Sequence, residues 1–207
     1  MGIYLHHVLG HKERWGMLLA RQSGVTLIEL VIAIAVLGIV IAMGLPSYSN
    51  WIANSQIRTT AESLLAGLQL ARNEAVRRNT SVRFSLVTNL TNTCQLSSTG
   101  TNWIVSRLDP AGKCGNGTSD IDPFIIQLKA SAEGGSNATI NADGTNVVFN
   151  GIGRVVTSVG QIGQISIDSS SLPSAQTRDL RIVIGSAGEI RMCDPDPNVG
   201  TTDPRRC

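Results

Sequence analysis

The sequence predicts an α+β fold, in which one long N-terminal helix packs on an antiparallel β-sheet. Three observations support this prediction: an apolar run of 21 residues that begins at Val25, a stretch with helical periodicity directly after it, and short alternating segments between turn residues in the remainder. The 207 residues suit one domain, or one domain plus an appendage. The 21 glycines and the 4% aromatic content favour strands and turns over a helix bundle.

The first expected element is a membrane-spanning helix over residues 25–45. Its apolar run is interrupted only by Thr26 and Glu29, and about 20 apolar residues suffice to cross a bilayer. Basic residues precede the run, which predicts that the N-terminus stays cytoplasmic and that the part after the span is exported. An ordinary secretory signal is the alternative, although its apolar region would be unusually long.

Glu29 is the unexpected residue in this segment. A carboxylate inside a membrane helix costs about 2.5–3.5 kcal/mol on insertion scales, so such a residue normally has a partner. The residues one helical turn away offer none. A cleavage after Gly24 would create a free amine on Val25, and the amine of a neighbouring subunit could then neutralise Glu29.

Residues 46–80 are expected to continue the helix as an amphipathic segment. We therefore predict one helix from about Val25 to about Arg78. A bend is expected near Gly44 and Pro46, because proline removes a backbone donor.

The two faces of this second half of the helix have different compositions. The leucines at positions 64, 65 and 68 are expected in the core. The arginines at the helix end and just after it are interpreted as a solvated face, with a nucleic-acid contact strip as the alternative. These arginines are Arg72, Arg77, Arg78 and Arg83.

Residues 81–207 are predicted to form the exported, β-rich domain. Strand-like runs alternate with turn signals such as Asp143-Gly144 and Asn150-Gly151. The expected strands are Val82–Leu86, Trp103–Ser106, Phe124–Leu128, Thr139–Ile140, Asn146–Phe149, Arg154–Val156, Gln164–Ile167, Leu180–Ile184 and Glu189–Met192.

Four cysteines, an even number, predict disulfides in an exported domain. Three pairings are possible. We favour Cys94–Cys114 and Cys193–Cys207, because each joins neighbours across a polar, turn-rich loop. Metal binding is the rival interpretation, but the sequence contains no Cys-x-x-Cys spacing, so no metal is expected.

Composition argues against an enzyme. The three histidines, His6, His7 and His11, all lie upstream of the apolar run, so removal of a leader would leave no histidine for a nucleophilic triad or an imidazole metal site. The sequence contains no phosphate-binding glycine loop either. No catalytic residue and no cofactor are therefore expected.

The run Gly24-Val25-Thr26-Leu27-Ile28-Glu29, followed by apolar residues and Pro46, closely resembles the class III signal of type IV pilins and type II secretion pseudopilins. The resemblance implies a type IV pilin fold and a leader, residues 1–24, that a prepilin peptidase removes on the cytoplasmic face. It also implies methylation of the new N-terminus at Val25. The family usually has Phe at that position, so Val25 is a departure that bears on methylation.

Two further stretches, Val148–Arg154 and Ile184–Pro195, resemble the C-terminal half of the GspH/FimT group. That group contains pseudopilin H of type II secretion and the FimT and FimU minor pilins. The resemblance implies a structural minor pilin that takes part in type IV pilus assembly or priming. It also implies a single-pass location in the bacterial inner membrane with a periplasmic C-terminal domain, and later incorporation into a pilus or pseudopilus. The expected partners are prepilin peptidase and, through the N-terminal helix, other pilins or pseudopilins.

Pseudopilin H of a type II secretion system is the alternative function, and a DNA-binding minor pilin of natural transformation is a further one. Some FimT-like pilins use a Gly-Arg-x-Arg turn, but here Glu189 stands in place of the first arginine. The chain from Val25 carries 14 Lys and Arg against 14 Asp and Glu, which also disfavours DNA. The candidate DNA contacts are Arg191, Arg205 and Arg206.

Overall fold

The computed structural model describes residues 24–130, 137–173 and 175–207, with the side chains of residues 43–47 outside the description. All of the predicted leader except Gly24 therefore lies outside the described residues. The chain divides into two compact units, Met1–Met43 and Gly44–Cys207, and each is considered by itself. We call the second the C-terminal unit.

Helix α1 (Leu27–Arg78) has 52 residues and confirms the long helix predicted from the sequence. It is continuous through Pro46, and the bend expected at this proline stays a prediction. The helix ends at a left-handed residue, Asn79, with φ of 47°. The amide of Thr80 donates to the carbonyl of Ala75 at 3.1 Å, which satisfies one of the carbonyls left open at a helix end.

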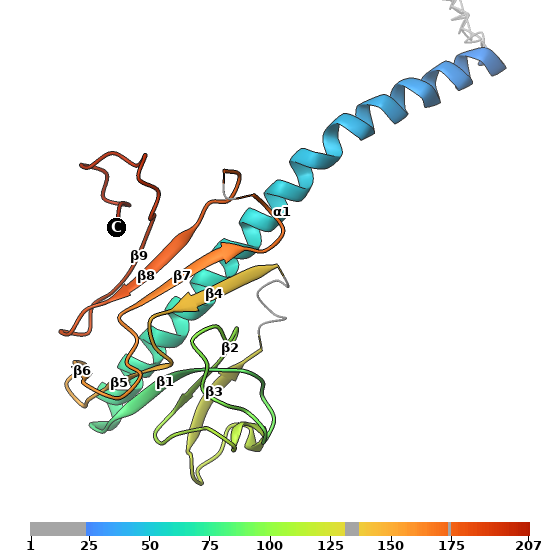
Figure 1. The fold of residues 1–207 in the computed structure, drawn as a ribbon. Helices are drawn as coiled ribbons and strands as arrows, with labels where there is room; N and C mark the ends of the chain where they lie inside the picture. The colour runs from blue at the N-terminus through green and yellow to red at the C-terminus, as the bar shows by residue number, and fades with distance from the viewer. Residues whose placement is uncertain (1–23, 131–136, 174) are drawn as a thin grey trace, which may run out of the picture. The chain divides into compact units, whose positions relative to one another are not determined.

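Within the described ranges, nine antiparallel strands form two sheets rather than the single sheet expected from the sequence. The five-stranded sheet has the order β3-β2-β1-β5-β6, and the four-stranded sheet has the order β4-β7-β8-β9. Figure 1 shows the two groups of strands. Their bounds are β1 (Val82–Val87), β2 (Asn102–Ser106), β3 (Ile125–Lys129), β4 (Ala138–Ala142), β5 (Asn146–Phe149), β6 (Val155–Val156), β7 (Gln164–Ser169), β8 (Leu180–Ile184) and β9 (Ile190–Cys193).

The division arises because the chain leaves the first sheet after β3. It places β4 beside β7, returns for β5 and β6, and completes the second sheet with β7, β8 and β9. Local alternation in the sequence indicates where strands occur, but it does not indicate which distant strand each one pairs with. All the predicted strand positions correspond to observed strands.

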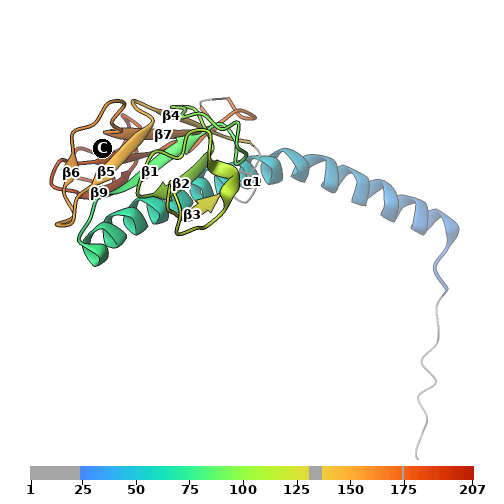
Figure 2. The same ribbon diagram turned by 90° about the horizontal axis from the view of Figure 1, so that it is seen from below.

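The core of the C-terminal unit lies between α1 and the strands. Figures 1 and 2 show the helix after Gly44 running along one side of the sheets. Its inward residues recur at alternating spacings of four and three, the period of one helix face, and each is at most 1% exposed. They are Ile57, Ala61, Leu64, Leu68, Ala71 and Ala75. Leu65, also expected in the core, is only partly buried against it.

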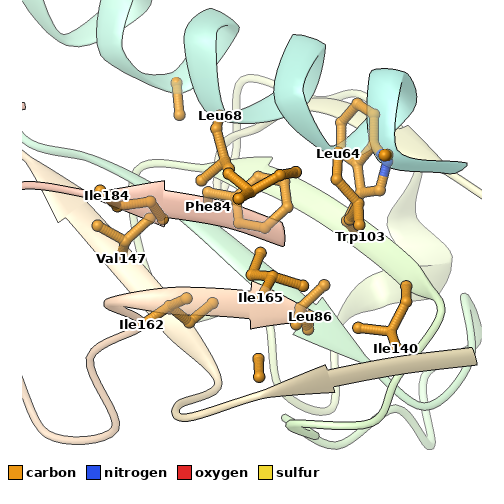
Figure 3. Close-up of a cluster of buried hydrophobic side chains, with 14 of the residues drawn as sticks. Leu64, Leu68, Phe84, Leu86, Trp103, Ile140, Val147, Ile162, Ile165 and Ile184 are labelled. Atoms are coloured by element: carbon orange, nitrogen blue, oxygen red, sulfur yellow. The ribbon is translucent and has the colours of Figure 1, made fainter. Parts of the chain in front are cut away.

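Small residues allow the helix to approach the strands closely. A Cβ atom on Gly67 would lie 2.9 Å from Cε2 of Phe84 and 3.1 Å from the ring of Trp103. The ring centroids of Phe84 and Trp103 are 5.7 Å apart. The indole N–H of Trp103 donates to the hydroxyl of Ser63 at 3.1 Å. Figure 3 shows Leu64 and Leu68 of the helix directed toward Phe84 and Trp103. Burial of each such side chain contributes about 1.5–3 kcal/mol.

A second, smaller cluster includes the first disulfide. Val87 and Ile104 belong to it, whereas their neighbours Leu86 and Trp103 belong to the main core, so the two clusters lie on opposite faces of the five-stranded sheet. Cys94 and Cys114 are joined and are 2% and 1% exposed. Cys193 is joined to Cys207, so the structure has the pairing favoured from the sequence.

Candidate processing and assembly site

Thr26 determines where α1 begins. Its hydroxyl accepts a hydrogen bond from the amide of Glu29 at 3.3 Å, and its carbonyl accepts one from the amide of Leu30 at 3.2 Å. Thr26 is therefore the N-cap residue, and the Thr-x-x-Glu spacing is that of a capping box. As a result Gly24, Val25 and Thr26 are not helical, and the predicted cleavage point between Gly24 and Val25 lies outside the helix.

The surroundings of this cleavage point are open. Val25 is 70% exposed, and a Cβ atom built on Gly24 would meet no atom within 4 Å. Among the described residues, nothing packs against this bond that an enzyme would have to displace.

Glu29 occupies the first turn of α1, where the positive end of the helix dipole favours a carboxylate. Among the described residues, Glu29 forms no ion pair, so its carboxylate is available to another molecule. The carboxylates that do form ion pairs are Glu62, Glu74, Asp109, Asp122 and Asp203.

No side chain among the described residues of the first unit covers the apolar part of α1 from Leu27 to Ile41. Large side chains on every side of the helix are between 51% and 81% exposed. In the part of the chain that the structure describes, no helix reaches the length and apolarity required to cross a membrane. The exposed residues are Leu27, Ile28, Leu30, Val31, Ile32, Ile34, Val36, Leu37, Ile39, Val40 and Ile41.

The candidate DNA contacts at the C-terminus are held by the protein itself. The guanidinium of Arg191 donates to the carbonyl of Arg206 at 3.2 Å, so the structure brings these two residues together. The guanidinium of Arg206 donates to the carbonyl of Val199 at 3.4 Å. Arg205 forms an ion pair with Asp203 at 2.7 Å, and this bond lowers the pKa of Asp203 to about 2. These side chains therefore fasten the C-terminal tail.

The arginines near the end of α1 are also engaged. Arg77 and Arg78 both pair with Glu74, and the hydrogen bond from Arg77 is the main cause that lowers the pKa of Glu74. Arg83 lies 3.7 Å from Asp109. These ion pairs neutralise part of the positive charge, although Arg77 and Arg78 share one carboxylate, and this partial neutralisation weakens the contact-strip interpretation.

Three segments that are distant in the sequence meet at a contact that the sequence did not predict. Arg72 of α1 donates from Nε to the carbonyl of Gly153 at 3.2 Å. A Cβ atom on Gly188 would lie 1.9 Å from that same carbonyl oxygen, and φ of Gly188 is +89°. The two stretches that carry the GspH/FimT resemblance therefore meet at the end of the helix. In the sequence, Gly188 in the β8–β9 turn was the signal that pointed to this close approach.

A polar groove of about 1010 Å³ was also not foreseen. It lies on the four-stranded sheet beside the segment after β9 and contains Asp168, Asp179, Arg181 and Asp194. The β7–β8 pairing ends at Ile167 and Leu180, and the same register continued by one residue sets Asp168 opposite Asp179. Burial, followed by hydrogen bonding to Asp168, raises the pKa of Asp179. Among the described residues no group of three or more histidine, cysteine or acidic side chains could hold a metal ion.

Comparison with known proteins gives matches over both parts of the chain. The family model of the type II transport protein GspH matches residues 60–188, and that of the prokaryotic N-terminal methylation motif matches residues 19–45. The fimbrial protein EcpC of Eikenella corrodens is 30% identical over 139 residues, which are 61% of this chain and 88% of EcpC.

Other similarities are more restricted. The type IV major alpha-pilin of Moraxella bovis is 48% identical over 46 residues, so the match spans 22% of this chain and 29% of that pilin. A crystal structure of the minor pilin FimU of Pseudomonas aeruginosa has a TM-score of 0.42 and 17% identity, and the match covers 67% of this chain and 92% of FimU.

The methylation motif, the long N-terminal helix and the antiparallel sheets define a type IV pilin-like protein. More particularly, the chain belongs to the GspH family, because that family model covers more than half of it.

Proposed function

We propose that this protein is a structural minor pilin that takes part in the assembly or priming of a type IV pilus. In this proposal prepilin peptidase cleaves after Gly24, and residues 25–45 hold the processed chain in the inner membrane until it enters the fibre. The observation that carries the proposal is the combination of Glu29 in the first helical turn, which has no ion-pair partner among the described residues, with an apolar helix whose large side chains are exposed on all sides. The similarity to the fimbrial protein EcpC over most of its length supports it.

The physical basis is the transfer of the apolar helix from lipid to a bundle of similar helices. Van der Waals packing between helices replaces contact with lipid tails. The amine of a neighbouring subunit would pair with Glu29, which removes the cost of an uncompensated carboxylate in an apolar environment. Because only one axial position brings the two groups together, the pair would set the register between subunits.

Two substitutions test this proposal. Glu29→Gln keeps the shape of the side chain and removes its charge, and Glu62→Gln is the matched control on the exposed part of the same helix. We expect the Glu29 variant to be processed and folded, but to be at least about tenfold depleted from sheared fibres relative to wild type. The Glu62 variant should be incorporated normally. Normal incorporation of the Glu29 variant would refute the register role.

The processing step has its own test. Gly24→Ala should leave the leader attached, which is measured as the mass of the membrane-bound protein. Gly38→Ala is a suitable control, since a Cβ atom there meets nothing within 4 Å. A Gly24 variant still shortened by about 24 residues would contradict the proposed cleavage point.

Pseudopilin H of a type II secretion system is the second candidate, and the match to the GspH family model favours it. Both candidates use the same N-terminal chemistry. Deletion of the gene separates them: loss of surface fibres supports the pilus, and periplasmic retention of secreted enzymes supports the secretion system. DNA binding is not favoured, because Arg191, Arg205 and Arg206 are engaged within the tail.

A further inference from the structure

Two exposed aromatic residues stand out on α1. Tyr48 and Trp51 are 61% and 65% exposed, and their rings stack with centroids 6.1 Å apart and an interplanar angle of 29°. By contrast, Phe84 and Phe149 are fully buried and Trp103 is 3% exposed. Those three side chains belong to the core, and Phe124 is partly buried beneath the guanidinium of Arg107, which lies 4.9 Å from its ring centroid. The exposed pair therefore requires a separate explanation.

The core does not account for this pair, because the C-terminal unit covers another face of the same two helical turns. The side-chain amide of Asn50 donates to Oε1 of Gln176 at 3.0 Å, and that of Asn54 donates to the carbonyl of Gln176 at 3.1 Å. The amide of Arg178 donates to Oδ1 of Asn54 at 2.8 Å. The loop before β8 is therefore fastened to the asparagine face and leaves the aromatic face open.

The position of the pair along the sequence points to a partner. Leu45 is the last residue of the apolar run, and no charged residue occurs between Glu29 and Arg58. With a helical rise of about 1.5 Å per residue, Tyr48 and Trp51 follow Leu45 by roughly 5 Å and 9 Å along a helix axis. The headgroup region on each side of a bilayer core is about 5–8 Å thick. If residues 25–45 span the hydrocarbon, Tyr48 thus falls within the headgroup layer and Trp51 falls at its outer edge.

We propose that Tyr48 and Trp51 form a membrane-interface anchor that contacts phospholipid headgroups on the outer side of the inner membrane before assembly. This inference rests on the proposed membrane stage of the protein. Tyrosine and tryptophan suit this environment, because their ring bodies are apolar whereas the phenol and the indole N–H need polar partners. Because the two rings stack, they form one aromatic patch on the helix. The anchor would fix the depth of the helix and hold the C-terminal unit next to the membrane surface.

The test measures the depth of Trp51 in phospholipid vesicles. The test uses a variant with the substitution Trp15→Phe, which leaves Trp51 and Trp103 as the tryptophan fluorophores. Trp103 is buried in the C-terminal unit and serves as the internal reference. The full chain is reconstituted into phosphatidylethanolamine and phosphatidylglycerol vesicles that contain lipids brominated either near the headgroup or near the chain end. We expect quenching at least twofold stronger with bromine near the headgroup. Trp51→Phe should abolish the lipid-dependent quenching.

The other outcomes separate this inference from the function on which it rests. Protein that floats with the vesicles while Trp51 remains open to aqueous acrylamide would overturn the anchor and leave the membrane stage intact. Trp51 shielded from acrylamide but not quenched by either lipid would show that a second protein copy covers the pair, which also overturns the anchor. Failure of both variants to float would overturn the proposed membrane stage, and the anchor with it.

Discussion

The two halves of α1 differ in what surrounds them. Between Leu27 and Ile41 the large apolar side chains are at least 51% exposed on every side of the helix. Between Ile57 and Ala75 the apolar side chains of one face are at most 1% exposed, and polar residues occupy the opposite face. The second half is stabilised by its own chain. The first half, apolar all around, has no such partner among the described residues and requires lipid or another subunit for stability.

The strongest test of this difference compares one leucine from each half. Leu68→Ala removes a fully buried side chain and should lower the free energy of unfolding of the C-terminal unit by about 3–5 kcal/mol. Leu37→Ala changes a side chain that is 58% exposed and should leave that free energy unchanged. Urea unfolding in detergent, followed by Trp103 fluorescence, measures both. An equal loss of unfolding free energy in both variants would contradict the conclusion that only the second half of α1 is stabilised by the C-terminal unit.

The two disulfides allow a second comparison, between two parts of the C-terminal unit. Cys94→Ala with Cys114→Ala should cost at least about 3 kcal/mol, because it opens a loop of about 20 residues and disturbs a buried cluster. Cys193→Ala with Cys207→Ala should cost less, because the loop is shorter and Cys207 is exposed. Urea midpoints of the two double variants give the ranking. A larger loss from the second pair would show that the tail contributes more than its contacts suggest.

A smaller effect is expected where the helix end meets the sheets. Gly188→Ala forces a side chain into a left-handed backbone and against the carbonyl of Gly153, and we expect a loss of about 1–3 kcal/mol. Gly200→Ala is the control, because a Cβ atom there meets nothing within 4 Å. Thermal unfolding of both variants is the measurement. Equal melting temperatures of the Gly188 variant and wild type would argue against the close approach.

The smallest expected effect concerns pH. Asp203 has a pKa of about 2, below its ordinary value of 3.8, because Arg205 donates a hydrogen bond to it. The interaction is therefore complete above about pH 4 and is lost as the pH falls through 2. Arg205→Gln should return the pKa toward 3.8, which a carbon-13 titration of the carboxyl group detects. An unchanged pKa in the variant would assign the shift to another group.

The sequence predicted most of the fold because its signals are local. The alternation of Val82, Phe84 and Leu86 marks a half-buried strand, and the structure places these side chains in the core. Periodicity is less reliable at a helix end: Val76 follows the apolar period of α1, yet it lies in the last turn and is 50% exposed.

Pairing between distant segments could not be predicted in this way. The neighbour of β4 is β7, and Arg72 meets Gly153 from 81 positions away. Such contacts depend on tertiary packing, and a single sequence carries no periodic signal for them. The polar groove is of the same kind, because the β7–β8 register, continued by one residue, sets Asp168 opposite Asp179. For the N-terminal site, the motif from Gly24 to Glu29 located the candidate residues, and the structure added the cap by Thr26.

The central claim is that cleavage after Gly24 makes Val25 the N-terminal residue of the mature subunit, and that the apolar first half of α1 then packs against the helices of other subunits. Mass spectrometry of the N-terminal peptide of the native protein tests it most directly. The account predicts a chain that begins at Val25, with or without an added methyl group, and retains Glu29 in its first helical turn. A native chain that begins at Met1, or beyond Pro46, would contradict it.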